Sequence, residues 1–434
     1  MKNRISAAPI CVLLSGLESN RLLPVVIILS IGLFGSLFLY YDATSAGEEL
    51  PFNPGLVDDL VQELEEANQE INQLEITNNE LGERVETLES EPLVVIVENP
   101  ELILDVSGEG DVKNVILFIG DGMGVGQLTA AEVMNGDEDL VLTRLPFKSL
   151  VTTHSSSNFV TDSAASATAL ATGHKTRNGK VSVTADGEDI FTVLEDAEEL
   201  GKATGIVTTA RVTHATPACF VSHVDNRDKE TTIAEQLLES GVDVALGGGS
   251  TYFTGLSPET EGYTVVYDST ELENIESGKV LGLFTPGYMN YETDRSESEP
   301  SLSEMTTKSL ELLSTDPEGF FLMVESGRID HASHDHHFDN TIAEMLEFDL
   351  AVLEALEYAA GRDDTLVIVT ADHETGGLSI VGGYPSGGGM QINWVTDGHV
   401  GGMVPVYAYG PRASETITFD DNTDIGVFLL SVIE

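Results

Sequence analysis

Basic residues are scarce in this chain. Lys and Arg number 20 among 434 residues, against 73 Asp and Glu, which gives a formal net charge of −53. Nucleic acid is excluded as a partner because a phosphate backbone is bound through Lys and Arg. The apolar fraction of 41% opposes disorder and favours a folded domain whose hydrated acidic surface suits a salty medium. Any anion must therefore be bound locally, by metal ions, arginine or backbone N–H groups.

Cysteine is also rare, and this excludes a fold held together by disulfides. The two cysteines, Cys11 and Cys219, are far apart in the chain, and Cys11 precedes a long apolar segment. We expect Cys219 to be a small buried apolar residue.

The apolar segment covers residues 22–41 and contains 20 residues without a charge. This length suffices for a helix that crosses a bilayer. Lys and Arg precede it and acidic residues follow it, which predicts a cytoplasmic N-terminus (1–21), a membrane anchor, and the rest of the chain outside the cytoplasm. A cleaved signal peptide, and hence secretion, is the alternative because small residues follow at Ser45 and Ala46.

A heptad repeat over residues 57–88 follows a linker at 42–56. Apolar residues alternate at spacings of three and four over about five heptads, which is typical of a coiled coil. The core positions are Val57, Leu60, Leu64, Ala67, Ile71, Leu74, Leu81, Val85 and Leu88, with Asn78 at the polar one. The pattern favours a parallel homodimer, and the alternative is a single amphipathic helix packed on the main domain.

After a connector at 89–112, which contains a possible short strand at 93–97, the remaining chain (113–434) alternates strand and helix patterns. Short β-rich runs such as NVILFIG and DTLVIVT are separated by helical patterns, as at 191–200 and 342–360. This alternation predicts an α/β fold with a mostly parallel central sheet and helices on both faces. Ligands of such sheets bind beyond the carboxyl ends of the strands.

Carboxylates and imidazoles follow several of these predicted strands. Taken singly, each is usually structural, whereas together they suffice for two zinc sites with oxygen and nitrogen ligands. Two such metals are suited to phosphoryl transfer. The candidates are Asp121, Asp330, His334, Asp372, His373 and His399, with His336 and His337 as possible bystanders.

The segment TDSAASATALATG, residues 161–173, contains Ser163 without a histidine nearby in sequence. It is either a tightly packed helix start or a nucleophile that a metal activates in place of a histidine base. Small side chains would let the helix N-terminus approach a phosphate closely. Arg227 is the candidate for a fork that binds two phosphate oxygens.

These motifs resemble those of the alkaline phosphatase family. Six pieces occur in family order from about Lys113 to the end: IGDGMG, TDSAASATALATG, THATPACFVSHVDNR, VESGRIDHASH, TADHETGG and DGH before VPVYAYG. The resemblance implies hydrolysis of small phosphate monoesters through a phosphoserine on Ser163, with Arg227 as the phosphate clamp and Asp162 orienting Arg227 or the serine turn.

The resemblance also implies two Zn²⁺ ions and one Mg²⁺ ion. Asp121, Asp372 and His373 would bind the zinc that activates Ser163, and Asp330, His334 and His399 the other zinc. The third site would be formed by Asp121, Thr216 and Glu325.

The resemblance places His214 and His331 beside the phosphate or the third metal, and both match the animal enzymes rather than the best-known bacterial one. Only 25 residues separate His373 from His399, where relatives often carry an extra surface domain that contributes to dimer contact. The coiled coil is therefore expected to take over pairing. The alternatives for function are a phosphodiesterase or phosphomutase on the same scaffold and, less favoured, an inactive anchored structural protein.

We predict that a fragment spanning residues 57–88 self-associates more strongly in high salt. Its flanking positions are mostly acidic, as at Glu63, Glu70 and Glu75, and salt screens their mutual repulsion. Analytical sedimentation at several salt concentrations checks this, and a monomer at every concentration would contradict it.

Overall fold

The structure, a computed structural model, describes residues 94–96, 103–105, 110–136, 139–383 and 389–433. The predicted anchor (22–41), linker and coiled coil (57–88) lie outside these residues. Within the described ranges, no helix combines the length and apolarity needed to cross a membrane. The short strand expected in the connector is present as β1 (Val94–Ile96), which pairs antiparallel with β2 (Ile103–Asp105).

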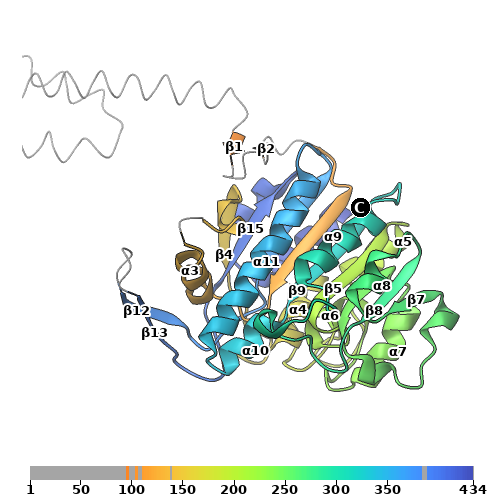
Figure 1. Cartoon of the computed structure of the whole chain (residues 1–434), viewed down its shortest axis with the longest axis horizontal. Coiled ribbons are helices and arrows are strands. Elements are labelled where there is room, and N and C mark those ends of the chain that lie inside the picture. Colours follow the sequence, from red (N-terminus) through yellow and green to blue (C-terminus); the bar gives the residue numbers. More distant parts are fainter. Residues whose placement is uncertain (1–93, 97–102, 106–109, 137–138, 384–388, 434) are drawn as a thin grey trace, which may run out of the picture. The chain divides into compact units, whose positions relative to one another are not determined.

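One large sheet dominates the described part of the chain (Figure 1). Its strand order is β4-β15-β10-β3-β9-β5-β6-β8-β7. The seven strands from β10 to β7 are parallel, and β15 runs antiparallel to both β10 and β4. The strands are β3 (Asn114–Gly120), β4 (Phe147–Val151), β5 (Ala203–Arg211), β6 (Val244–Gly248), β7 (Tyr263–Val266), β8 (Lys279–Leu283), β9 (Phe320–Ser326), β10 (Thr365–Thr370) and β15 (Val404–Tyr409). The predicted α/β class with a mostly parallel sheet is confirmed.

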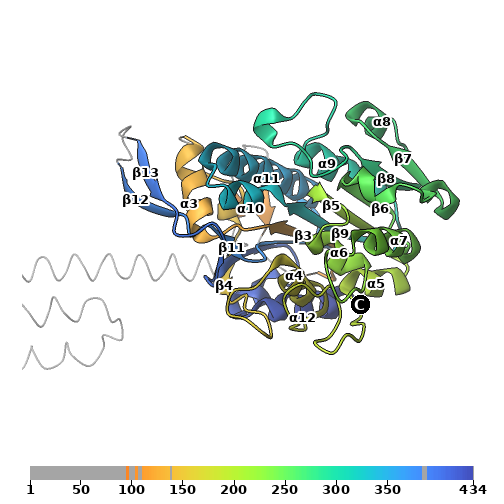
Figure 2. The same ribbon diagram turned by 90° about the horizontal axis from the view of Figure 1, so that it is seen from below.

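Helices cover both faces of this sheet, as Figure 2 shows. One layer contains α3 (Val125–Met134), α9 (Leu302–Leu313), α10 (Arg328–His334) and α11 (Phe338–Ala359). The other contains α4 (Ser163–Thr172), α5 (Val193–Glu199), α6 (Ala215–Val221) and α12 (Asn422–Ile433). Two further helices, α7 (Glu230–Ser240) and α8 (Ser269–Glu273), lie toward the β7 edge. The helices predicted at 191–200 and 342–360 correspond to α5 and α11.

The core lies on both faces of the central strands. All seven residues of β3 are buried, as expected for a parallel strand covered on both sides. Phe118 of β3 meets Phe348 of α11 edge to face, with ring centroids 5.9 Å apart. Cys219 is buried and free, as predicted.

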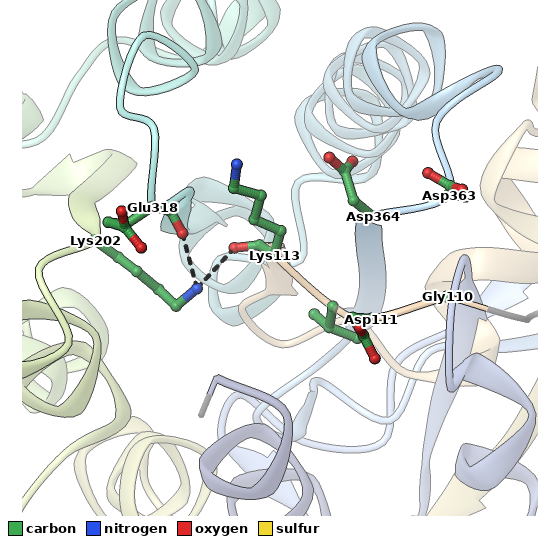
Figure 3. Close-up of a pocket in the computed structure, with 8 residues that line it drawn as sticks. Gly110, Asp111, Lys113, Lys202, Glu318, Asp363 and Asp364 are labelled. Atoms are coloured by element: carbon green, nitrogen blue, oxygen red, sulfur yellow. Dashed lines mark hydrogen bonds between the residues drawn. The ribbon is translucent and has the colours of Figure 1, made fainter.

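At the N-terminal ends of the parallel strands lies a pocket that is lined mostly by charged residues (Figure 3). Lys202, just before β5, donates from Nζ to the carbonyl oxygens of Lys113 (3.1 Å) and Glu318 (3.0 Å). Lys113 precedes β3 and Glu318 precedes β9, so one ammonium group ties together the starts of three neighbouring strands. Ligands of such sheets bind beyond the C-terminal ends of the strands, so the candidate site is expected at the opposite end of these strands.

Two small ribbons lie outside the main sheet. Strand β11 (Glu374–Thr375) pairs antiparallel with β14 (His399–Val400), and β12 (Ser379–Gly383) pairs with β13 (Met390–Asn393). The first ribbon sets Thr375 directly opposite His399. These ribbons occupy the short interval between His373 and His399.

Helix α4 is buried at every one of its ten positions. Its sequence, SAASATALAT, is made almost entirely of small side chains, so α6 and α12 can pack closely against it. The closest approach involves Gly426 of α12. A Cβ atom at this position would lie 2.3 Å from the Ala169 carbonyl oxygen and 2.3 Å from the Gly173 nitrogen.

We expect Gly426→Ala to destabilise the protein by about 1–3 kcal/mol, because the backbone atoms that it would contact cannot move aside without shifting α4. This loss should exceed the gain of about 1 kcal/mol that Ala brings to a helix relative to Gly. Denaturant unfolding measures the difference. Gly402→Ala is the control, since no described atom lies within 4 Å of its Cβ position. A Gly426→Ala protein as stable as the parent would contradict the packing argument.

Candidate active site

Three neighbouring strands place carboxylates at the edge where they end. Asp121 directly follows β3, Asp372 follows β10, and Glu325 lies near the end of β9. The register aligns these ends, because Ile119 pairs with both Thr370 and Glu325. All three acidic side chains are fully buried. Three acidic groups are thus removed from water within a small volume.

Asp121, Asp372 and His373 form the first group, in which one potential ligand atom of each residue lies within 4.8 Å of the others. His373 Nε2 is 3.2 Å from Asp372 Oδ2 and 3.6 Å from Asp121 Oδ1. None of the described residues gives a hydrogen bond to Asp372 Oδ2 or to either carboxylate oxygen of Asp121. Burial, reinforced by the other carboxylates, raises the pKa of Asp121, and burial raises the pKa of Asp372 to about 6. Buried carboxylate oxygens that accept no hydrogen bond are suited to binding a cation.

Asp330, His334 and His399 form the second group. Asp330 and His334 lie one turn apart on α10, as their spacing predicts, and His399 comes from β14. Asp330 Oδ1 is 3.4 Å from His334 Nε2 and 3.6 Å from His399 Nε2. The two Nε2 atoms are only 3.1 Å apart.

Hydrogen bonds fix the orientation of both rings in this second group. His334 Nδ1 contacts the Asp397 carbonyl oxygen at 2.5 Å, and His399 Nδ1 contacts that of Thr161 at 2.9 Å. Carbonyl oxygens only accept, so each Nδ1 carries the hydrogen and each Nε2 is free to bind a metal. Without a metal, the hydrogen bond to Asp330 raises the pKa of His334 to about 9. A divalent cation would replace that proton.

Asp121, His214 and Glu325 form a third group, which shares Asp121 with the first. Burial raises the pKa of Glu325 to about 7, although the Thr208 hydroxyl donates a hydrogen bond to it and Thr216 also lowers its pKa. In the described part of the chain, Thr216 Oγ1 and His214 Nδ1 are buried without a hydrogen-bond partner of ordinary geometry. The expected ligands Glu325 and Thr216 are therefore here, and His214, which the resemblance places beside the phosphate or the third metal, lies in the same group.

Ser163 is the first residue of α4 and is almost fully buried. Its Oγ atom lies 3.2 Å from His373 Nε2, so a histidine remote in sequence is adjacent in space. Helix α4 therefore begins at the first group of ligands. This is the position from which a hydroxyl near a metal can act as a nucleophile.

Asp162 caps α4 and also holds Arg227. Its Oδ1 accepts a hydrogen bond from the Ala165 backbone, and its Oδ2 accepts from the Gly179 backbone (2.9 Å) and from Arg227 Nη1 (3.1 Å). Arg227 Nη2 is 3.0 Å from His214 Nε2, which must accept because arginine only donates. The two roles considered for Asp162 are thus performed by its two oxygens.

Thr375 links the first and second groups, and sequence reasoning missed it. Its hydroxyl donates to Asp330 Oδ1 and lies 3.3 Å from His373 Nδ1. Because the hydroxyl hydrogen is used on Asp330, Thr375 can accept from His373 Nδ1–H, which leaves His373 Nε2 directed at Ser163. The only signal in the sequence is its position two residues after His373.

The other histidines of the cluster lie outside the three groups. His331 packs against Tyr288, with ring centroids 4.1 Å apart, and burial lowers its pKa to about 4. His336 stacks on Trp394 and contacts the Thr396 carbonyl oxygen at 2.7 Å. His337 is exposed and precedes α11.

We predict that Asp162→Ala destabilises the protein more than removal of a simple helix cap. Loss of a cap costs about 0.5–2 kcal/mol, and the charged hydrogen bonds to Arg227 and Gly179 add about 1.5 kcal/mol or more. Asp268→Ala is the matched control, because Asp268 caps α8 through the Glu271 backbone. Equal losses of unfolding free energy in the two variants would show that the contacts to Arg227 and Gly179 add nothing.

Comparison with known proteins agrees with the family resemblance of the sequence motifs. The family described as alkaline phosphatase matches residues 112–390. Alkaline phosphatase 3 of Bacillus subtilis is 40% identical over an alignment of 291 positions, which covers 63% of this chain and 63% of that protein. The chain thus matches somewhat less than two thirds of this relative's length. Alkaline phosphatase of Escherichia coli is 33% identical over 396 residues, covering 72% of this chain and 84% of that one.

Solved structures agree with the sequence matches. The alkaline phosphatase of the Antarctic bacterium TAB5 superposes with a TM-score of 0.70 at 33% identity, covering 75% of this chain and 99% of that one. A cold-active alkaline phosphatase from Shewanella gives a TM-score of 0.69 at 32% identity. On the evidence of its sequence, its sheet and its buried ligand groups, this chain belongs to the alkaline phosphatase family.

Proposed function

We propose that this protein hydrolyses phosphate monoesters through a phosphoserine on Ser163. The observation that carries the proposal is the set of buried carboxylate oxygens without partners around this serine. Asp121, Asp372 and Glu325 each have at least one such oxygen. Buried carboxylates are ordinarily hydrogen-bonded, and a gathering of buried carboxylate oxygens that accept no hydrogen bond indicates metal ligation.

The three groups would hold three cations. We assign zinc to the group of Asp121, Asp372 and His373 and to the group of Asp330, His334 and His399, because mixed carboxylate and imidazole ligands suit zinc. We assign magnesium to the group of Asp121, Glu325 and Thr216, with His214 beside it. A variant of the TAB5 enzyme has magnesium in a site named M3, which supports a third site in the family. When bound, such ions lower the pKa of hydroxyl groups and stabilise negative charge on oxygen.

The protein residues prepare the transfer. Ser163 Oγ is directed by its contact with His373 and by the start of α4, whose free N–H groups favour an anion. In the first step the Oγ–P bond forms and the bond from phosphorus to the ester oxygen breaks. The serine hydroxyl loses its proton and the leaving alcohol gains one. In the second step the oxygen of a water molecule bonds to phosphorus and the Oγ–P bond breaks. The water gives up one proton, Ser163 Oγ regains one, and inorganic phosphate is released.

Arg227 would bind two oxygens of the transferring phosphoryl group. Asp162 and His214 fix two of its nitrogens, so the guanidinium group is held in place before a substrate arrives. A preorganised charge of this kind stabilises the transition state without reorganisation during the reaction. His331, which is neutral near pH 7 because burial lowers its pKa to about 4, adds no fixed positive charge.

We predict that Ser163→Ala abolishes phosphoenzyme formation. The wild-type protein, quenched in acid after mixing with a monoester labelled on phosphorus, should retain label on Ser163. Ser157→Ala, an exposed serine of the loop before α4, is the control and should retain it too. Label that remains attached to the Ser163→Ala protein would show that another residue is the nucleophile.

Chelation should abolish activity on a monoester, and zinc with magnesium should restore it. Because burial raises the pKa of Glu325 to about 7, this carboxyl group is increasingly protonated below that pH and the metal must displace the proton. Restoration by a given metal concentration is therefore expected to be weaker at about pH 6 than at about pH 8. Full activity of the metal-free protein would contradict the proposal.

A phosphodiester assayed in parallel tests the alternative phosphodiesterase activity.

A further inference from the structure

A second arginine, Arg328, lies near the site, and unlike Arg227 it forms no ion pair with a described residue. Arg328, the first residue of α10, is half-buried and has no carboxylate within ion-pair distance in the described part of the chain. Its guanidinium carbon lies 3.7 Å from the centre of the Tyr291 ring and 5.4 Å from that of Tyr288. Its Nε is buried, and no described residue accepts a hydrogen bond from it. A buried cationic donor without an acceptor is unusual in a chain with a net charge of −53.

Arg211 provides an internal comparison. It also lies against Tyr288, at 4.0 Å, but Glu230 binds it through two hydrogen bonds of 2.7 and 2.6 Å. Its charge is therefore neutralised by an acidic side chain of this chain. Arg328 donates instead from Nη1 to His331 Nδ1, at 3.0 Å, and His331 is a neutral acceptor. The nearby Glu344 interacts with Arg328 through its charge. No described acidic side chain, however, forms an ion pair with Arg328 or accepts a hydrogen bond from it.

A short series of contacts connects Arg328 to the phosphate clamp. Arg227 contacts His214, the rings of His214 and His331 are 5.7 Å apart, and His331 contacts Arg328. Tyr288 borders the same two rings, at 5.7 Å from His214 and 4.1 Å from His331, and 37% of its surface is exposed. The cluster therefore continues from the clamp toward solvent.

The chemistry of the cluster favours an anion over a flat aromatic group. Arg211 and His331 already lie against the Tyr288 ring, and Arg328 lies over Tyr291, so these rings are engaged. What the cluster offers is a guanidinium group that forms no ion pair with a described carboxylate and whose Nε–H has no acceptor among the described residues. It lies in partly desolvated surroundings, where a charged hydrogen bond is strong. A carboxylate or a second phosphate group meets both requirements.

We propose that Arg328, bordered by Tyr288 and Tyr291, forms a subsite that binds a second anionic group on the leaving part of the substrate. The preferred substrates are then monoesters whose alcohol carries a carboxylate or another phosphate. This inference rests on the proposed phosphatase function and adds a substrate class to it.

The test compares substrates that differ in a single charge. 3-Phosphoglycerate is paired with glycerol 3-phosphate, and 6-phosphogluconate with glucitol 6-phosphate, so that a carboxylate replaces a hydroxymethyl group at two distances from phosphorus. Rates are measured at high salt, where long-range charge effects are screened. We expect the wild-type protein to prefer the carboxylate substrate of at least one pair. Arg328→Gln should lower kcat/KM for that substrate about tenfold or more and should change kcat/KM for the hydroxymethyl analogue little.

Two further variants make the comparison specific. Arg328→Lys keeps the charge but not the planar fork and should retain part of the preference. Arg177→Gln removes an exposed charge from the turn that Asp162 holds through Gly179, and it should leave the preference unchanged. An equal loss for both members of a pair, no loss at all, or the same loss in Arg177→Gln would overturn the subsite.

A binding measurement separates this inference from the proposed function. 3-Phosphonopropionate and propylphosphonate cannot be hydrolysed and differ by a carboxylate in place of a methyl group. If neither ester pair is hydrolysed, the phosphatase proposal fails, and calorimetry with these two ligands still decides on Arg328. Tighter binding of the carboxylate that disappears in Arg328→Gln supports the subsite, and equal binding of the two ligands by the wild-type protein overturns it.

Discussion

Repulsion among buried carboxylates is the constraint on which the rest of this site depends. Asp121, Asp372 and Glu325 lie at the ends of three adjacent strands, and Asp330 reaches the same region from α10. Burial and mutual repulsion raise the pKa of Asp121, with Asp372 and Asp330 as the main neighbours that contribute. Such an arrangement is unfavourable unless cations occupy it. The fold tolerates it because parallel strands, held in register by their hydrogen bonds, end at the same level.

Hydrogen bonds at the far side of each imidazole convert this crowded region into defined ligand groups. The Nδ1 atoms of His334 and His399 bind backbone carbonyl oxygens, and that of His373 contacts the Thr375 hydroxyl. Each ring therefore presents Nε2 inward. The pairing of β11 with β14 brings two of these rings together, since His373 and His399 stack at 3.6 Å. Thr375 belongs to the same ribbon, so one short pair of strands orients residues of both groups.

Much of this arrangement can be predicted from sequence because it follows from strand ends. Asp121, Asp372 and His373 directly follow apolar runs, and the four-residue spacing of Asp330 and His334 places them on one helix face. The antiparallel direction of β15 has no local signal, because a single strand looks the same in either direction. Thr375 and the position of His214 beside Glu325 depend on contacts between segments far apart in the chain. The 22–41 and 57–88 predictions rest on composition and periodicity alone.

The excess of acidic residues is compatible with the proposed binding of a phosphate ester, because surface charges and groups at the site act over different distances. Salt at a physiological concentration screens surface charges beyond about 8 Å, and this screening distance becomes shorter at higher salt. The distant acidic surface therefore contributes little repulsion at the site. Close to Ser163, fixed positive groups act in partly desolvated surroundings where charges interact more strongly. Arg227 and Arg211 are each oriented by one acidic residue, Asp162 and Glu230, which reduces the charge that they present. Arg328 is held by an imidazole and two aromatic rings instead, so no ion pair with a described acidic residue fixes its orientation. In a chain so poor in basic residues, the partner that orients an arginine therefore decides how strongly it attracts an anion.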